Sequence, residues 1–197
     1  ECTTGPLGQG FAMGVGMAHA EAYLRNLFYS ISSKARDFIN HYTYVLATDG
    51  DIQEPVAMGA AALAGHLGLN KLIVYYDSND AQISGKVSRS DSADYIKVFS
   101  GFNWNVQNIN GHDHDAIRDA IKNAQNSDKP NIIIGNTIMA KGSSSMEWDH
   151  NTHGAPLPQD EINATKQVLG LPDNKFYCPN EIRSHFRNRF KSLSERS

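Results

Sequence analysis

The sequence has 197 residues, of which 40% are hydrophobic and 20% are charged, enough for one globular domain with its own core. The formal net charge at pH 7 is −3, so no overall positive field attracts nucleic acid. No apolar run approaches membrane-spanning length, and the first residues carry no secretory pattern. Cys2 and Cys178 have no metal-site spacing, and two isolated cysteines are typical of a reduced, cytoplasmic protein.

The first predicted element is a helix over residues 7–28, which follows a loop rich in Gly and Pro. Its first half is dense in small residues, although a Gly inside a helix costs about 1 kcal/mol relative to Ala. Close packing compensates for that cost, so we expect Gly14 and Gly16 to lie tightly against a sheet. The polar residues 29–41 then form a surface connection to the first strand.

Residues 44–85 have the pattern of strand, acidic loop, helix and second strand. The two apolar runs, 44–47 and 72–76, are short and continuous, which is typical of strands buried on both faces of a parallel sheet. The intervening residues have the length of a crossover helix. Both strands therefore end at one edge of the sheet, where open α/β sheets bind ligands. This arrangement brings Asp49 and Asn79 together, and their oxygens suit a hard cation such as Mg²⁺.

Simpler interpretations exist for several polar residues. Asp, Gly and Asn at strand ends are also ordinary turn formers. Asp51 is either a helix cap or a residue that orients the metal ligands without contacting the metal itself. His112 and His114 have no third soft ligand nearby, so we interpret their surroundings as a turn and a helix cap.

The rest of the chain continues the alternation of helices and strands. We expect a loop and N-cap at residues 88–91 opening a helix through 99, strands at 104–109 and 131–139, and a helix at 115–125. A long loop follows at 141–157, and loops of this length are often functional. The alternation predicts an α/β fold with a mostly parallel sheet and helices on both faces.

Two surface helices, near 159–169 and 180–190, close the sequence. The second carries a basic cluster, which we interpret as a solvated face: Arg183, Arg187, Arg189 and Lys191.

Three ordered segments resemble signature motifs of the transketolase family of thiamine-diphosphate enzymes. They are residues 3–10 (Thr-Thr-Gly-Pro-Leu-Gly-Gln-Gly), the Asp49-Gly50…Asn79 unit, and residues 153–157 (His-Gly-Ala-Pro-Leu). Their order and spacing match that family, and the resemblance runs from about residue 3 to about 190. It implies the thiamine-diphosphate-binding fold.

The resemblance implies a domain organisation as well. Residues 1–157 would form the thiamine-diphosphate- and Mg²⁺-binding α/β domain, and 158–197 its C-terminal helices leading to a linker. The chain starts at Glu1, without Met and just before a motif, so we expect that domain to be N-terminally incomplete.

The resemblance also implies a metal site. Asp49 and Asn79 would hold Mg²⁺ (or Ca²⁺) together with the backbone carbonyl of Ala81. Gly50 would donate its backbone N–H to a diphosphate oxygen of the coenzyme.

Further residues would contact the coenzyme. Gly5 and Leu7 would border it, and Ile83 would lie against its thiazolium ring. Glu54 would lie near the coenzyme and the subunit interface, although the helix dipole alone also favours an acid at this first-turn position. His153 would contact diphosphate or substrate oxygens and help proton transfer, and it is the one catalytic residue expected in this chain.

The implied activity is transfer of a two-carbon ketol group from a ketose phosphate to an aldose phosphate in the pentose phosphate pathway. The resemblance implies a cytoplasmic homodimer in which the partner's pyrimidine-binding domain supplies an activating glutamate, so this chain alone would be inactive. Alternatives are a dihydroxyacetone synthase, a split-subunit transketolase, or a non-catalytic fragment or regulator that keeps the fold.

Two residues depart from the family pattern. Thr48 replaces the first Gly of Gly-Asp-Gly, and Gly59 stands where many members have an acid. Trp148, Asp149 and His150 receive no role from the sequence.

Overall fold

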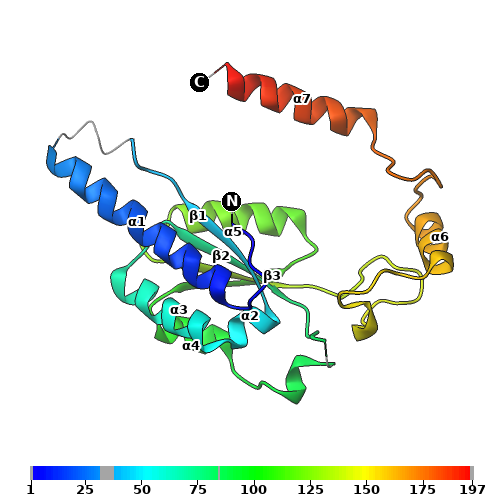
Figure 1. Ribbon diagram of the computed structural model, residues 1–197, viewed down its shortest axis with the longest axis horizontal. Coiled ribbons are helices and arrows are strands. Elements are labelled where there is room, and N and C mark those ends of the chain that lie inside the picture. Colours follow the sequence, from blue (N-terminus) through cyan, green and yellow to red (C-terminus); the bar gives the residue numbers. More distant parts are fainter. Residues whose placement is uncertain (1, 32–37, 84, 196–197) are drawn as a thin grey trace. The chain divides into compact units, whose positions relative to one another are not determined.

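The computed structural model describes residues 2–31, 38–83 and 85–195 (Figure 1). The strands are β1 (Thr43–Thr48), β2 (Leu72–Ser78), β3 (Asn105–Asn110) and β4 (Asn131–Asn136). The α-helices are α1 (Gln9–Ile31), α2 (Asp49–Gln53), α3 (Pro55–Leu67), α4 (Tyr95–Gly101), α5 (His114–Gln125), α6 (Gln159–Val168) and α7 (Asn180–Ser194). The described residues also include the short 3₁₀ helices η2 (Val87–Arg89) and η3 (His150–Thr152).

The four strands form one parallel sheet in the order β1-β2-β4-β3. Thr48 pairs with Asp77, and Asp77 pairs with Gly135, so neighbouring strands end at the same level. This register confirms the predicted parallel α/β fold. It also places the residues that follow β1 and β2 side by side at the carboxyl edge of the sheet.

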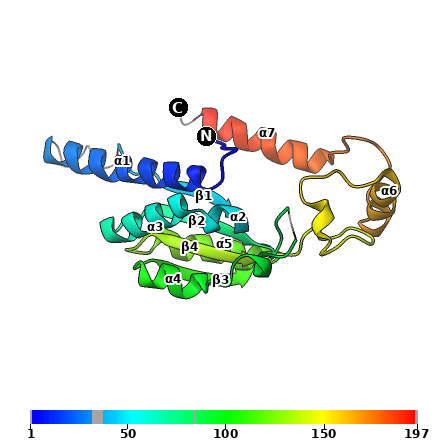
Figure 2. The ribbon, with the colours of Figure 1, turned by 60° about the horizontal axis from the view of Figure 1, so that its bottom comes forward.

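Helices cover both faces of the sheet. One core contains Phe11 of α1, Ala61 of α3 and Phe99 of α4, packed on Val74 and Ile132 of the strands. The other core is smaller and joins α5 to the opposite face. Figure 1 accordingly shows α5 across the strands from α3 and α4, and α1 runs beside α3 in both ribbon views (Figures 1 and 2).

The small residues of α1 have two different environments. A Cβ placed on Gly14 would lie 2.3 Å from Cγ2 of Val45, so this glycine permits the helix to approach β1. A Cβ placed on Gly16 would meet nothing within 4 Å. The expectation of tight packing is therefore confirmed for Gly14 and wrong for Gly16, which is exposed on the other side of the helix.

Several boundaries differ from the sequence prediction. The acidic segment after β1 is the short helix α2 rather than a loop, because the Asp51 side chain accepts from the backbone of Thr48 and caps it. The helix expected to open near Asp91 begins at Tyr95, because the Asp94 side chain caps it by accepting from Lys97 N. The helix α1 reaches Ile31, and the remainder of the predicted surface connection falls partly on residues 32–37, outside the described residues.

The chain divides into two compact units, residues 1–141 with 148–155 and residues 142–147 with 156–197. In the second unit, Glu161 of α6 accepts hydrogen bonds from the backbone N and the hydroxyl of Ser145, each at 2.8 Å. These donors lower the pKa of Glu161. The predicted boundary near residue 157 stays a prediction.

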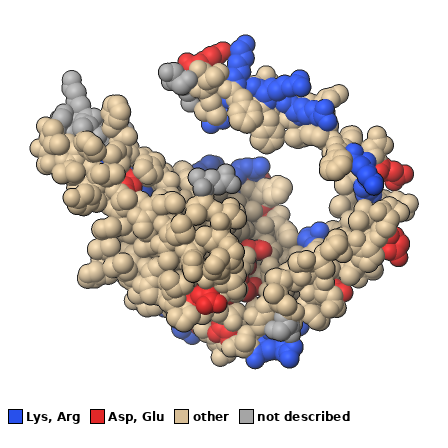
Figure 3. All heavy atoms as spheres, viewed as in Figure 1, with Lys and Arg blue, Asp and Glu red and all other residues tan. Residues whose placement is uncertain are grey.

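Helix α7 has no buried residue, which confirms the solvated face expected for its basic cluster. Lys and Arg side chains stand out on this helix in Figure 3. No helix within the described ranges is long and apolar enough to cross a membrane.

Candidate functional site

Asp49 lies at the carboxyl edge of the sheet, directly after β1, and is only 3% exposed. Its Oδ1 accepts a hydrogen bond from the Tyr76 hydroxyl at 2.5 Å, and its Oδ2 accepts one from Asn79 N at 3.1 Å. The first bond comes from within β2 and the second from the loop that follows it. Asp49 and Asn79 are therefore neighbours, as their positions after adjacent strands predict.

The environment of Asp49 is unusual for a carboxylate. Burial, with a smaller contribution from the nearby Asp77, raises the pKa of Asp49, while the hydrogen bonds from Tyr76 and Asn79 act in the opposite direction. The ion pairs formed by the described residues include none to Asp49. A buried carboxylate without a basic partner suits an oxygen-ligated cation, because the ion supplies the missing positive charge.

The side-chain amide of Asn79 is held in one orientation. Its Nδ2 donates to Asp77 Oδ2 at 3.1 Å, and its Oδ1 accepts from Ala81 N at 3.0 Å. Asp77 is in turn held by the hydroxyl of Thr137, which follows β4. An amide oxygen has two lone pairs, so Oδ1 keeps one for a further contact.

A cavity of about 270 Å³ gathers most of the predicted coenzyme residues. It is lined by Leu7, Thr48, Gly50, Ala81, Gln82, Ile83 and His153. A Cβ placed on Gly50 would lie 3.2 Å from Cδ1 of Leu7, so a larger residue at position 50 would crowd this wall. Ile83 is 84% exposed, which leaves an apolar side chain free to contact a ligand.

His153 reaches the cavity from the long loop after β4. His153 is the C-cap of η3, and its backbone N donates a hydrogen bond to His150 O at 3.0 Å. Asp149 caps the same turn, since its Oδ1 accepts from Asn151 N at 2.9 Å. Asp149, whose role no sequence motif predicts, thus helps form the turn that carries His153.

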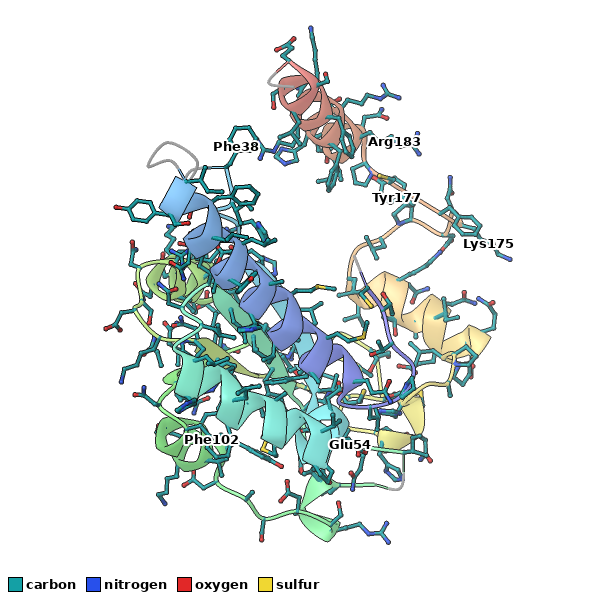
Figure 4. All side chains as sticks on the ribbon, turned by 60° about the vertical axis from the view of Figure 1, so that its left-hand side comes forward. Phe38, Glu54, Phe102, Lys175, Tyr177 and Arg183 are labelled. Atoms are coloured by element: carbon teal, nitrogen blue, oxygen red, sulfur yellow. The ribbon has the colours of Figure 1, made fainter. Side chains whose placement is uncertain are left out.

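Three predicted coenzyme residues, Gly5, Glu54 and Asn79, lie outside this cavity wall. Gly5 does not line the cavity, and a Cβ placed on it would meet nothing within 4 Å. Glu54 joins α2 to α3, where Figure 4 labels it, and its Cβ lies 2.7 Å from a Cβ placed on Gly8. Glu54 therefore supports the turn that follows Leu7 rather than the cavity itself.

Sequence reasoning missed several residues of the site. In the sequence Tyr76 is only part of an apolar run, yet its hydroxyl donates a hydrogen bond to Asp49. The apolar pattern places Thr137 inside a strand, whereas β4 ends at Asn136, one residue before it. Trp148 and His150 line a second cavity, of about 400 Å³, together with Asn79 and Lys86. Asp77 links Asn79 to Thr137, and its position directly after the apolar run 72–76 is the feature of the sequence that points to a role at this edge of the sheet.

Comparisons with known proteins identify the family. The model described as "Transketolase, thiamine diphosphate binding domain" matches residues 1–197. The transketolase of Sinorhizobium medicae is 43% identical over 184 residues, 93% of this chain and 26% of that protein. The transketolase of Staphylococcus epidermidis is 44% identical over 190 residues, 95% of this chain and 28% of that protein.

Solved structures agree with the sequence matches. The Campylobacter jejuni transketolase has a TM-score of 0.87 at 38% identity, covering 93% of this chain and 28% of that chain. The Leishmania mexicana transketolase has a TM-score of 0.90 at 35% identity, covering 98% of this chain and 29% of that chain. This chain thus spans only 26% to 28% of the curated relatives named above. It belongs to the transketolase family, as a thiamine-diphosphate-binding domain.

Proposed function

We propose that the full-length protein containing this chain is a transketolase, which transfers a two-carbon ketol group from a ketose phosphate to an aldose phosphate. This chain supplies the domain that holds the diphosphate and metal ion of thiamine diphosphate. The observation that carries the proposal is the cavity where Leu7, Gly50, Ile83 and His153 meet, together with the buried Asp49 that directly precedes Gly50 in the chain. When bound, thiamine diphosphate supplies the carbanion and the electron sink for the reaction.

The proposed metal ligands are the Asp49 carboxylate, the Asn79 amide oxygen and the backbone carbonyl of Ala81. The ion is Mg²⁺, with Ca²⁺ as a substitute, because all three donors are hard oxygens. Support comes from the buried charge of Asp49 and from the fixed amide of Asn79. These residues would hold the ion, and the positive charge of the ion would offset the negative charge of the diphosphate.

The remaining residues orient the coenzyme. Gly50 donates its backbone N–H to a diphosphate oxygen. Leu7 and Ile83 place apolar side chains against the rings and exclude water. His153 donates a proton or hydrogen bond to phosphate or substrate oxygens, which a histidine can do near neutral pH. Gly5 and Glu54 contribute through the Leu7 segment: Gly5 precedes Leu7 in the same loop, and Glu54 packs against the turn at Gly8.

The active assembly is a cytoplasmic homodimer of the pentose phosphate pathway. The pyrimidine-binding domain of a second subunit completes the site with the glutamate that activates the coenzyme ring. Support for a further domain comes from the length of the transketolase relatives, of which this chain covers 26% to 28%.

The test is Asp49→Ala in the full-length protein. We expect Mg²⁺-dependent binding of thiamine diphosphate, followed by calorimetry, to be lost, together with two-carbon transfer from ketose phosphate to aldose phosphate. Asp115→Ala is the matched control, because its side chain is 89% exposed on α5 and does not line the cavity. Unchanged Mg²⁺ dependence in Asp49→Ala would remove Asp49 from the metal site.

A further inference from the structure

Asp51 joins two segments that are far apart in the sequence. Its Oδ1 accepts a hydrogen bond from Gly8 N at 2.9 Å, across 43 residues. Its Oδ2 accepts from both the backbone N and the hydroxyl of Thr48, each at 3.0 Å. One carboxylate therefore links the turn before α1 to the end of β1. We call this set of contacts the Asp51 clamp.

The turn held by this clamp has little freedom of its own. Gly8 has φ +74°, a conformation that glycine adopts readily and other residues do not. A Cβ at Gly8 would lie 2.7 Å from the Cβ of Glu54 and 3.0 Å from Cγ1 of Val56. The Gly8 carbonyl also accepts from Ala12 N in the first turn of α1. The backbone next to Leu7 is thus fixed by packing against Glu54 and Val56 and by two hydrogen bonds, of which the one to Asp51 is made by a side chain.

Leu7 depends on this backbone for its position. Its side chain is 51% exposed and lines the cavity near Gly50, where an added Cβ would lie 3.2 Å from Leu7 Cδ1. A half-exposed side chain is held only partly by its own packing. Ordering it before a ligand arrives removes part of the entropy loss on binding.

We propose that Asp51 is a positioning residue, which acts through Leu7 to hold this wall of the cavity ready for the rings of the coenzyme. The proposal rests on the proposed function, since it needs thiamine diphosphate in that cavity. Thr48 belongs to the Asp51 clamp and to the cavity wall, because its hydroxyl donates a hydrogen bond to Asp51 and the residue lines the cavity. The Thr at this position, where the resembling family has Gly, is thus paired with Asp51.

The experiment compares Asp51→Asn with wild type in the full-length protein. Asn offers one acceptor oxygen in place of two, so the hydrogen bond from Gly8 N or the one from Thr48 N must be lost. We expect the dissociation constant of thiamine diphosphate at saturating Mg²⁺ to rise about tenfold, the effect of losing a charged hydrogen bond. At saturating coenzyme we expect kcat to stay near the wild-type value, because the substitution weakens binding of the coenzyme without changing the position of the bound coenzyme.

Asp113→Asn is the matched control. Asp113 also accepts from two backbone N–H groups at a helix start, Asp115 N at 2.9 Å and Ala116 N at 3.1 Å, but it caps α5. We expect its variant to change the midpoint of thermal unfolding at most and to leave coenzyme affinity unchanged. An equal loss of affinity in both variants would overturn the proposal, because general destabilisation would then explain it.

A double-mutant cycle with Leu7→Ala tests whether Asp51 acts through Leu7. If it does, Asp51→Asn weakens coenzyme binding far less in the Leu7→Ala background than in wild type. Full additivity would overturn the positioning role. Thr48→Val, which keeps the side-chain shape and removes one hydrogen bond, gives a smaller loss in the same direction, and Thr48→Ser restores affinity. These two variants carry the test if Asp51→Asn does not fold.

The outcomes separate this inference from the proposed function. Wild-type protein that binds thiamine diphosphate, with Asp51→Asn binding it equally well, would overturn the clamp and leave the function standing. Wild-type protein that does not bind thiamine diphosphate with Mg²⁺ would overturn both.

Discussion

At the scale of single residues, the hydroxyl of Tyr76 is the contact that most directly controls the proposed metal site. The ring is buried, and its edge meets Tyr95 with centroids 6.0 Å apart. Burial and the bond to Asp49 raise the pKa of Tyr76, so the phenol stays protonated and remains a donor at neutral pH. With Asn79 N on the other oxygen, this bond fixes the plane of the Asp49 carboxylate.

We predict that Tyr76→Phe weakens Mg²⁺ binding by about 10- to 100-fold, the range seen when a hydrogen bond to a metal ligand is removed. The measurement is a Mg²⁺ titration of the full-length protein at fixed thiamine diphosphate. Tyr75→Phe is the control, because this neighbour in β2 points to the opposite face, where a Cβ placed on Gly135 would lie 2.1 Å from its hydroxyl. Equal Mg²⁺ affinity in both variants would show that Tyr76 does not support the ligand.

At the scale of elements, α3 depends on small residues for its packing. Ala57, Ala61 and Ala64 are fully buried, and the Ala61 carbonyl accepts from Trp104 Nε1 at 2.8 Å. A Cβ placed on Gly65 would lie 1.7 Å from the backbone oxygen of Phe102. Backbone atoms cannot move aside as a flexible side chain can, so the glycine sets the distance between α3 and the end of α4.

We predict that Gly65→Ala destabilises the fold by about 1–3 kcal/mol, as expected for overpacking against a fixed neighbour. The matched change in the same helix is Gly59→Ala, where an added Cβ meets nothing within 4 Å. This variant gains up to about 1 kcal/mol from the better helix propensity of Ala. Urea unfolding of both variants measures the two free energies, and effects of the same sign would contradict the packing argument.

At the scale of the whole molecule, the proposed coenzyme cavity lies in one of the two compact units of the chain. The cavity at the carboxyl edge belongs to the first unit, and helices α6 and α7 belong to the second. The chain covers 26% of the Sinorhizobium medicae transketolase. A coenzyme-activating acid is therefore expected from elsewhere in the full-length protein or from its partner subunit.

We predict that the 197-residue chain alone turns over sugar phosphates at least about a hundredfold more slowly than the full-length protein, because a missing general acid–base group typically reduces the rate 10²- to 10⁴-fold. Assays of the two proteins at equal site concentration, with saturating Mg²⁺ and thiamine diphosphate, measure the ratio. Equal rates would contradict the proposal that a second domain completes the site.

The sequence by itself determined the parallel sheet and the placement of Asp49 beside Asn79. Continuous apolar runs and a crossover of helical length are local patterns, and the geometry of a βαβ unit converts them into one shared edge. Short motifs likewise determined the family, because each is read from adjacent residues.

Only the tertiary structure decided which side chains support that edge. The bond from Tyr76 to Asp49 spans 27 residues, and the bond from Gly8 to Asp51 spans 43. No pattern of neighbouring residues encodes such pairs, since an apolar run does not reveal where a tyrosine hydroxyl points. The difference between Gly14 and Gly16 has the same cause: both are small residues of one helix, and only the position of β1 distinguishes them.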